Sequence, residues 1–593
     1  MGKLRNIIGF FILLFFFSAC NHTNTANTGL TIGVSNENVF MIQGIVNAYN
    51  NKNPDNLITI DSIKSEESKN YRLEHNDLAD ELLIFDNYSD ANYYGDYLYN
   101  LKRLEIVNNY QISTINALKT TSDCLYVLPS IGKFYTNAIN LDALSDFATD
   151  VPKTTDEILT LAYRVNNKVN ESKYIRTSSS CGGTDSVLIT LMQIAFPRLF
   201  ANIFGNHFLR EYINCNVKMT DSNYYSYFAD IFNQLSYVYN LNLYSLDDIN
   251  KDSMECLDEF NNGLTIMTQN SIDNPFDEFI LADNIAYFPY VAKDSNQEWL
   301  ASKPLYYLSI NKNIEANKLE IAIDFLKFFS ASENQQYMKV TRTKNNITDT
   351  YVSYVKDTYI DVNPKYQNVL NVVKSGRVFL VDIFQSIYRK NINLIIQFLK
   401  NEISLDDLLK LIDNYVENIY TSNRKKISSS VDFKYFEEGS KFYETRLGNL
   451  YADGIKRQAN VDCVIIDYNT INENLYADGV YLDEIDCVFA NRRLYYVKLK
   501  AIDLKKLIFN GDLPLISGVR ISNGKLYNVN KKEITDDQII YALIDYSYLN
   551  DDLEATIGKE INSNAVFSEY LMKINSIVDI KLDGRYGEYN EKN

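Results

Sequence analysis

Short strand-like runs alternate with amphipathic helices between residues 29 and 90, and this alternation limits the fold more than any other feature. The run Leu30–Ser35 (LTIGVS) is short and apolar and ends in turn-forming residues, as strands do. Apolar residues then recur at helical spacing between Val39 and Tyr49. Two more strand-like runs follow, at Leu57–Ile60 and Glu81–Asp86. The alternation predicts a doubly wound α/β lobe.

Ligands of doubly wound sheets usually bind beside the carboxyl ends of the strands. The loops 35–38 and 86–89 follow two of the predicted strands, so we expect both at a ligand site. Asp86 and Asn87 offer hydrogen-bonding groups, and Tyr88 offers an aromatic face on which a sugar or a base can stack. The alternative is that Tyr88 packs in the core and the polar residues are merely solvated.

The amino terminus carries the features of a lipoprotein signal peptide. Lys3 and Arg5 precede the apolar run Ile7–Phe17, which is shorter than the roughly 20 residues that span a bilayer as a helix. Ser18-Ala19-Cys20 follows as a loose lipobox, and residues 21–28 form a polar tether. We therefore expect residues 1–20 to be the signal, with Cys20 lipidated. The chain would be anchored at the cell membrane and would face the periplasm or the cell exterior; an ordinary secretory signal is the alternative.

The net charge excludes one class of partner. The formal charge of −18 disfavours nucleic acid, whose phosphates repel an acidic chain. Beyond the first twenty residues no apolar run is long enough to span a membrane, so the lipid is the only attachment predicted.

The residues of catalytic and metal sites are scarce. Six cysteines remain besides Cys20, without CxxC spacing, and the chain has only 3 histidines. No Ser-His-Asp or Cys-His set can be assembled, so we expect neither a metal nor a cofactor.

Five segments, in the same order, resemble elements of the extracellular solute-binding proteins of ABC transporters, family 1, the sugar-binding branch. They are Ser122–Leu144, Val151–Val165, Glu259–Met267, Ala322–Gln336 and Leu399–Tyr420. The resemblance implies a type II, two-lobed periplasmic-binding-protein-like fold over residues 29–425. It also implies a non-enzymatic receptor that captures a small-molecule solute and delivers it to an ABC permease, with a sugar or oligosaccharide favoured and a nucleoside possible.

The resemblance also points to residues that would contact the solute. Phe134, Tyr135 and Trp299 correspond to positions that line the ligand site in that family, and they join Asp86, Asn87 and Tyr88 as candidates. For each aromatic residue the alternative is packing within or between the lobes.

The carboxyl-terminal part resembles a second family. After a polar linker over residues 426–441, residues 442–593 are similar to the C-terminal domain of 5′-nucleotidases, which implies an α/β fold with a mixed sheet. The similarity rests on Glu444-Thr445, Gly448–Asp453, Cys487–Ile508 and Ala542–Asp552. By this resemblance Phe489, Asn491 and Tyr546 would contact a nucleobase; the alternative is that they are retained only for structure.

Two departures argue against hydrolysis of nucleotides. The family's substrate loop, NGGxR, is replaced by residues 467–474 (DYNTINEN), with Glu473 near the place of the arginine. A carboxylate there removes bidentate recognition of phosphate and repels it. The metal-binding phosphoesterase domain that precedes this module in the family has no counterpart in the sequence. We expect no enzyme, and a nucleotide hydrolase or a nucleoside receptor remain as alternatives.

Overall fold

The computed structural model divides into two compact units, which are described separately. The first unit comprises residues 1–62, 79–210 and 221–408, and the second comprises residues 63–78, 211–220 and 409–593. The structure describes residues 29–593 apart from 169–172, 196–198, 200–202, 272–279, 282, 292–297, 339, 343–346, 350, 359–363, 421–425, 429–443, 474, 476–479, 510–513, 550–552, 575–581, 583 and 587–593. The signal segment with Cys20, the tether and most of the predicted linker lie outside the described residues.

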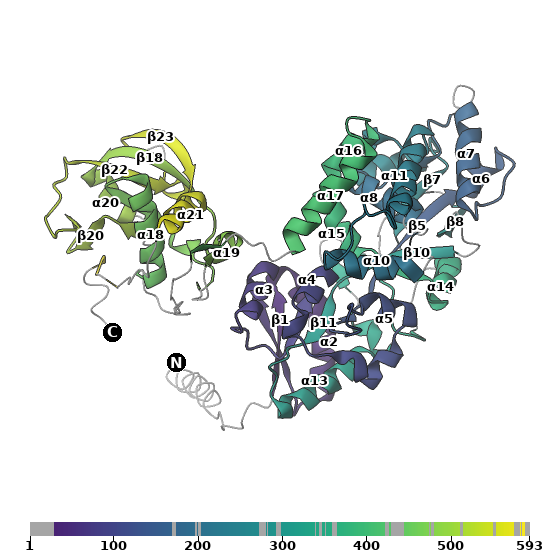
Figure 1. Ribbon diagram of the computed structural model, residues 1–593, viewed down its shortest axis with the longest axis horizontal. Coiled ribbons are helices and arrows are strands. Elements are labelled where there is room, and N and C mark those ends of the chain that lie inside the picture. The colour runs from purple at the N-terminus through teal and green to yellow at the C-terminus, as the bar shows by residue number, and fades with distance from the viewer. Residues whose placement is uncertain are drawn as a thin grey trace, which may run out of the picture. The chain divides into compact units, whose positions relative to one another are not determined.

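The first unit contains two lobes, each built around its own sheet (Figure 1). The first lobe has the strand order β2-β1-β3-β11-β4. Its strands are β1 (Leu30–Ser35), β2 (Ile58–Ile63), β3 (Leu82–Phe85), β4 (Leu128–Pro129) and β11 (Tyr307–Ile310). Strands β1 and β3 are parallel, and β11 runs antiparallel to β3. The strands and the helix predicted between residues 29 and 90 are confirmed, with α2 (Val39–Lys52) between β1 and β2.

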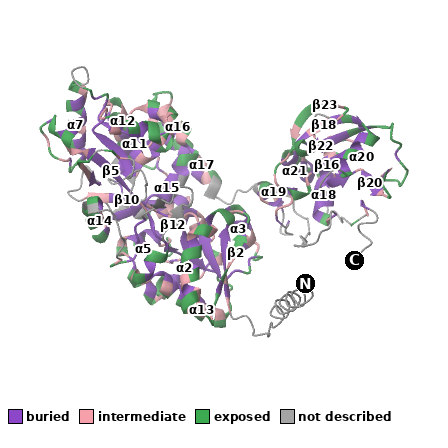
Figure 2. Ribbon diagram, turned by 180° about the vertical axis from the view of Figure 1, so that it is seen from behind, coloured by how far each residue is buried: buried purple, intermediate pink, exposed green. Residues whose placement is uncertain are grey.

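Apolar packing against this sheet explains why these segments form helices. Helix α2 buries Ile42, Ile45, Val46 and Tyr49, which recur at helical spacing along one face. The ring of Tyr49 meets Phe325 edge-on, at 5.1 Å between centroids, on α13 (Ala316–Phe329). Figure 2 shows buried residues along the strands of the sheets and exposed residues on the outer faces of helices such as α13.

The second lobe has the strand order β14-β10-β5-β7-β6, with β8 paired to β5 and β9 paired to β10. The strands are β5 (Gly132–Asn140), β6 (Ser178–Ser179), β7 (Met267–Ser271), β8 (Ile285–Phe288), β9 (Tyr290–Val291), β10 (Glu298–Pro304) and β14 (Val378–Leu380). The helices used below are α4 (Tyr88–Tyr93) of the first lobe and, in the second, α7 (Thr155–Lys168), α8 (Asp185–Thr190), α11 (Tyr225–Asn240) and α15 (Asp382–Lys390). A π-helical turn, η5 (Leu191–Ala195), follows α8.

Two crossovers connect the lobes, and they run side by side. The chain passes from β4 to β5 through Ser130 and Ile131, and from β10 to β11 through Leu305 and Tyr306. The backbone N–H of Ser130 donates to the carbonyl of Tyr306 at 3.0 Å, and that of Leu305 donates to Ile131 at 3.0 Å. A Cβ at Gly132 would lie 2.5 Å from the carbonyl oxygen of Lys303, so this close approach requires glycine.

The second unit is an α/β domain with a mixed five-stranded sheet in the order β19-β16-β22-β18-β23. Its strands are β16 (Cys463–Ile466), β18 (Arg493–Lys500), β19 (Leu515–Ser517), β22 (Ile539–Asp545) and β23 (Ala555–Asn562), with the β20 (Val519–Ser522) and β21 (Lys525–Asn528) hairpin beside them. Helices α18 (Arg446–Ala459), α20 (Ala501–Phe509) and α21 (Ser563–Lys573) complete it. Two apolar clusters form its core, one with α18 and α21 and the other with α20.

Residues 63–78, from the amino-terminal part of the chain, also belong to this unit. Helix α3 (Glu66–Glu74) packs on α19 (Leu482–Val488), and Tyr71 is buried among the residues of the α18 cluster. Arg72 Nε donates to Glu473 Oε2 at 2.8 Å. Glu473 is therefore held by an arginine from a distant part of the sequence.

Two structural features are absent from the described part of the chain. No helix there combines the length and the apolar character needed to cross a bilayer. No group of three or more His, Cys, Asp or Glu side chains there is arranged to hold a metal ion.

Candidate functional site

The loops after β1 and β3 meet at the carboxyl ends of these two parallel strands, as their positions predicted. Asn38 Nδ2 donates to Asp86 Oδ1 at 2.6 Å and to Ser35 Oγ at 2.8 Å. Asn87 Oδ1 accepts from the backbone N–H of Asp90 at 2.9 Å and so caps α4. Asp86 and Asn87 thus each accept a hydrogen bond that stabilises the conformation of the loop.

The carboxylate of Asp382 joins the two lobes. It begins α15, which follows the edge strand of the second sheet, and it is 2% exposed. Its Oδ2 accepts from the backbone N–H of Tyr88 and from the hydroxyl of Tyr307, each at 2.8 Å. Both donors belong to the first lobe. Burial, together with the charge of Asp382, holds the pKa of the Tyr307 hydroxyl well above its usual value.

Tyr88, Phe134 and Tyr135 lie at this junction and are buried. The Tyr88 hydroxyl donates to the carbonyl of Leu118 at 3.1 Å, and Tyr88 is 2% exposed. Phe134 is fully buried, and its ring centroid lies 5.3 Å from that of Tyr354. Tyr135 is 6% exposed on the same strand, β5. These placements bring three of the predicted aromatic residues to the lobe junction, while their contact with a solute remains a prediction.

Lys303 adds a charge to the junction. Burial lowers the pKa of its ammonium group, and the negative charges of Asp382 and Asp86 act against that shift. Lys303 lies opposite Lys133 in the β5–β10 pairing, and the positive charge of Lys133 lowers the pKa further. The junction therefore contains acidic and basic groups close enough to influence one another.

The second lobe contains buried hydrogen-bonding atoms that the described residues do not satisfy. On β5, Asn137 is fully buried, and neither its Nδ2 nor its Oδ1 has a partner there. The neighbouring Thr136 Oγ1 also lacks one, as do Gln193 Oε1 and Gln385 Oε1. Buried polar groups are nearly always hydrogen-bonded, and an unmade bond costs about 1–3 kcal/mol.

These atoms belong to elements that contact one another. Gln193 lies on η5, and its Nε2 donates to the carbonyl of Thr136 at 2.8 Å. Gln385 lies on α15, which packs against β10, α8 and α4. On α4, Ser89 Oγ is also buried without a partner among the described residues. These unsatisfied atoms are neutral amides and hydroxyls, and they lie in both lobes: Ser89 in the first, and Thr136, Asn137, Gln193 and Gln385 in the second.

Trp299 lies on β10, which contacts η5, and it is partly exposed. Its indole Nε1 is nevertheless buried and has no partner among the described residues. Trp299 pairs opposite Tyr290 on β9, while Asn137 pairs opposite Phe288 on β8. The segment 288–290 therefore runs between the two residues.

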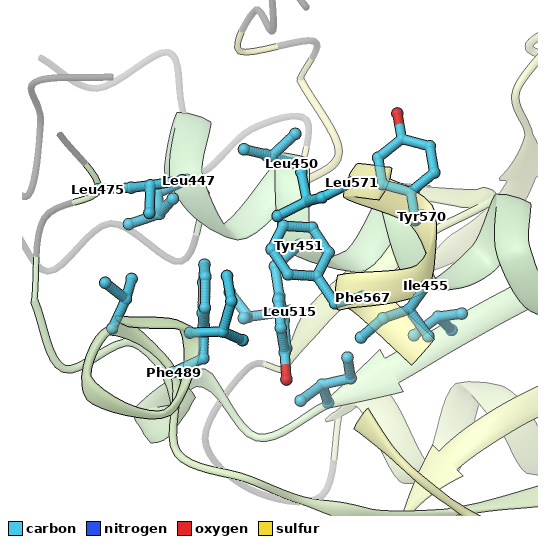
Figure 3. Packing of buried hydrophobic residues seen from close by; sticks show 14 of the residues in the cluster. Leu447, Leu450, Tyr451, Ile455, Leu475, Phe489, Leu515, Phe567, Tyr570 and Leu571 are labelled. Atoms are coloured by element: carbon cyan, nitrogen blue, oxygen red, sulfur yellow. The ribbon is translucent and has the colours of Figure 1, made fainter. Parts of the chain in front are cut away.

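The three residues predicted to contact a nucleobase have different surroundings. Phe489 is fully buried and stacks on Tyr451, with the ring centroids 4.1 Å apart, in the core drawn in Figure 3. Tyr546 is 54% exposed, and the guanidinium carbon of Arg493 lies 4.6 Å from its ring centroid. Asn491 Oδ1 accepts from the backbone N–H of Asn564 at 3.5 Å. No described contact brings Phe489 and Tyr546 face to face.

Acidic side chains also pair with arginine in the loop that replaces NGGxR. Besides the bond between Arg72 and Glu473, Arg492 NH2 lies 3.2 Å from Asp467 Oδ2. Arg492 Nε donates to Thr470 Oγ1 at 3.1 Å. The carboxylates of Asp467 and Glu473 in this loop thus each pair with an arginine of the same unit.

Sequence reasoning missed the residue that bridges the lobes and several of the unsatisfied ones. Asp382, Gln193 and Gln385 stand in helices of ordinary composition, and nothing in their spacing marks them. Asn137 could be found, because it follows the aromatic pair at positions 134 and 135 in the segment that resembles a lobe crossover.

Comparisons with known proteins support the fold of the first unit. No model of a known protein family matches the chain, and no curated protein matches it. Solved structures do match. A family 1 extracellular solute-binding protein from Bifidobacterium longum subsp. infantis is 13% identical with a TM-score of 0.53, covering 65% of this chain and 98% of that one.

Two further solved structures agree with this. The putative binding protein MsmE from Bacillus subtilis, in an open conformation, is 15% identical with a TM-score of 0.53, and 68% of this chain and 100% of that chain are covered. The bacterial solute receptor AcbH, described as exclusively preferring β-D-galactopyranose, is 11% identical with a TM-score of 0.52, covering 66% and 98%. At these identities the likeness shows the fold alone: two α/β lobes of the periplasmic-binding-protein type.

Proposed function

We propose that the chain is the lipid-anchored, extracellular solute-binding protein of an ABC importer and that it captures a carbohydrate-like solute between the two lobes of its first unit. The observation that carries this proposal is the set of buried, unsatisfied amides and hydroxyls around Asn137. The fold of the first unit and the solute-binding roles of the matching proteins support it.

The chemistry of the set favours a neutral, hydroxylated solute. Amides and hydroxyls offer both donors and acceptors, as do sugar hydroxyl groups. A phosphate or carboxylate would call for arginine or lysine, and the cationic Lys303 already lies near the carboxylates of Asp382 and Asp86. Trp299 and Tyr135 supply aromatic faces on neighbouring strands, on which a sugar ring can stack.

The proposed mechanism is a shift between an open and a closed arrangement of the lobes. Ligand that contacts Ser89 on one side and Asn137 or Gln193 on the other stabilises the closed state by its differential affinity. The paired crossovers at Ser130–Gly132 and Pro304–Tyr306 are where the chain passes between the lobes. Chemical catalysis is not part of this proposal, and the second unit is proposed to be a non-catalytic relative of the nucleotidase C-terminal domain.

Asn137→Leu tests the proposal sharply. Leucine has nearly the same size and removes two buried polar atoms that lack partners, so the unliganded protein should keep its stability or gain some. The same change should abolish binding of a solute that bonds to the amide. Thermal melting of the full exported chain with a panel of neutral mono- to tetrasaccharides, beginning with galactose, measures both effects, because binding to the folded state alone raises the melting temperature.

The outcomes are distinct. The proposal requires at least one saccharide to stabilise the wild type and not the leucine variant. A matched control, Asn51→Leu, changes an exposed asparagine on α2 of the first lobe and should bind as wild type does. If no saccharide shifts the wild type, or if Asn137→Leu binds equally well, the proposed site is wrong.

A further inference from the structure

The second unit contains a recessed, positively charged cavity apart from the residues predicted to bind a nucleobase. Its volume is about 130 Å³. Helix α18 contributes Asp453, Lys456 and Arg457, the β19–β20 connection contributes Gly518 and Arg520, and the carboxyl-terminal segment contributes Arg585. Four cationic side chains thus face one carboxylate, in a chain with 76 acidic and 58 basic residues. A solvated surface of such an acidic protein would not be expected to gather this charge.

Arg585 and Asp453 neutralise each other and form the floor of the cavity. Arg585 is 5% exposed, and its Nη2 donates to Asp453 Oδ2 at 2.8 Å while its Nη1 donates to the carbonyl of Ile516 at 2.5 Å. Asp453 Oδ1 accepts from Ser517 Oγ at 2.5 Å. Among the described residues that line the cavity, the one carboxylate is therefore already bonded to Arg585 and Ser517.

Lys456 and Arg457 carry the remaining charge on α18. Among the residues that the structure describes, Lys456 forms no hydrogen bond or ion pair, and Arg457 donates to the neutral hydroxyl of Tyr570 alone, at 3.3 Å. The stem of Lys456 lies against Gly518, where an added Cβ would come within 2.6 Å of Lys456 Cε. Gly518 has φ +87°, and its missing side chain leaves room for the lysine.

We propose that this cavity binds a small oxyanion: phosphate, sulfate or a carboxylate group. Lysine and arginine form charge-assisted hydrogen bonds with such groups, and the planar guanidinium can contact two oxygens at once. The cavity is smaller than the about 300–1,000 Å³ of pockets for drug-sized ligands, so it suits a small ion or the charged end of a larger molecule. This inference is independent of solute binding by the first unit.

Titration calorimetry of the full exported chain tests it, with inorganic phosphate, sulfate and citrate added separately in a buffer free of other multivalent anions. We expect at least one of them to bind saturably and Lys456→Gln to weaken that binding about tenfold or more, a change of about 1.4 kcal/mol. Binding should also weaken as sodium chloride is added, because salt screens the attraction. Lys559→Gln removes an exposed lysine on β23 and serves as the control, which should bind as wild type does.

Two results would overturn the proposal. One is that none of the three anions saturates the wild type by about 10 mM, which is too weak for a specific site. The other is that Lys456→Gln binds as tightly as wild type. Arg457→Gln gives a second measure of how much the cations of α18 contribute to anion affinity. Because Lys456 has no partner among the described residues, its replacement should not unfold the chain. Thermal melting of each variant verifies that a loss of affinity is not a loss of folding.

Discussion

Replacing Asp382 by alanine should be among the most destabilising single changes in the first unit. The carboxylate is 2% exposed and accepts two hydrogen bonds from the first lobe, from the N–H of Tyr88 and the hydroxyl of Tyr307. A hydrogen bond to a charged group contributes about 1.5–3 kcal/mol, and the alanine variant leaves two buried donors unpaired. The two bonds together predict a loss of roughly 3–6 kcal/mol.

Urea unfolding followed by the emission of Trp299, the single tryptophan of the chain, measures this loss within the first unit. Tyr307→Phe removes one of the two donors and should account for about half of the effect, roughly 1.5–3 kcal/mol. Asp185→Ala is the matched control, because Asp185 pairs with Arg389 on the surface, with both side chains 51% exposed. Such pairs contribute about 0–1 kcal/mol. If Asp382→Ala destabilises no more than Asp185→Ala, the role of Asp382 as a bridge between lobes is refuted.

Four further predictions can be checked independently. Gly132→Ala should destabilise the first unit by about 1–3 kcal/mol, because the new Cβ would lie 2.5 Å from the carbonyl oxygen of Lys303; urea unfolding gives the value, and an unchanged midpoint would contradict it. Burial alone would raise the pKa of Glu81, but hydrogen bonds from Lys318 and Thr31 outweigh it and lower that pKa, so the stability that Glu81 provides is present above about pH 4.5 and is lost as the pH falls below it. Unfolding curves of Glu81→Gln should therefore lie below those of wild type at pH 7 and converge with them in acid. Burial raises the pKa of Cys256 to about 11 and that of Cys463 to about 12, so neither thiol should react with iodoacetamide at pH 8 unless urea is added; labelling of the native protein at either residue, read by mass spectrometry, would contradict this. Cys20→Ser should move the chain from the detergent phase to the aqueous phase in detergent phase separation, and a variant that partitions as wild type does would refute lipidation at Cys20.

The sequence predicts a strand or helix well where the spacing of its apolar residues and the length of the segment indicate the same element. Leu30–Ser35 is a strand over the predicted residues, because it is a short apolar run that ends in turn-forming residues. The meeting of the loops at Asn38 and Asp86 follows from parallel pairing of β1 and β3. These features depend on local pattern and on the geometry of α/β sheets, both of which are visible in a sequence.

The chemistry of the candidate site is less visible. The charge of Asp382 acts across the junction on groups from α4 and β11, and the sequence does not show that a helix beginning at residue 382 will meet them. The missing partners of Asn137 and Gln193 follow from how neighbouring elements pack, which is a property of the tertiary structure. The cysteines show the same limit: the six that the structure describes are free, and of these Cys256 and Cys463 are buried, which their scattered positions in the sequence do not reveal.

The tail shows how a resemblance can suggest residues without establishing their role. The predicted nucleobase residues include Phe489, which stacks on Tyr451 inside the core, and Tyr546, which is 54% exposed. Glu473, expected to repel phosphate, bonds to Arg72 at 2.8 Å. Incubation of the purified chain with AMP or UDP-glucose and Mg²⁺, Mn²⁺ or Zn²⁺ should release no phosphate above a blank. Turnover that persists through repurification and stops with a chelator would favour the hydrolase alternative.

The measurement that tests solute capture most directly is a titration of the full chain with the saccharide that stabilises it most in thermal melting, followed through the emission of Trp299. We expect a saturable change in emission with one site per chain, because the buried indole Nε1 gains a partner or a new environment when the lobes close. Trp299→Ala should remove the signal and, measured by calorimetry, weaken binding roughly ten- to a hundredfold while the chain stays folded. Emission that stays flat at saturating saccharide, together with an alanine variant that binds as wild type does, would contradict a binding site at Trp299.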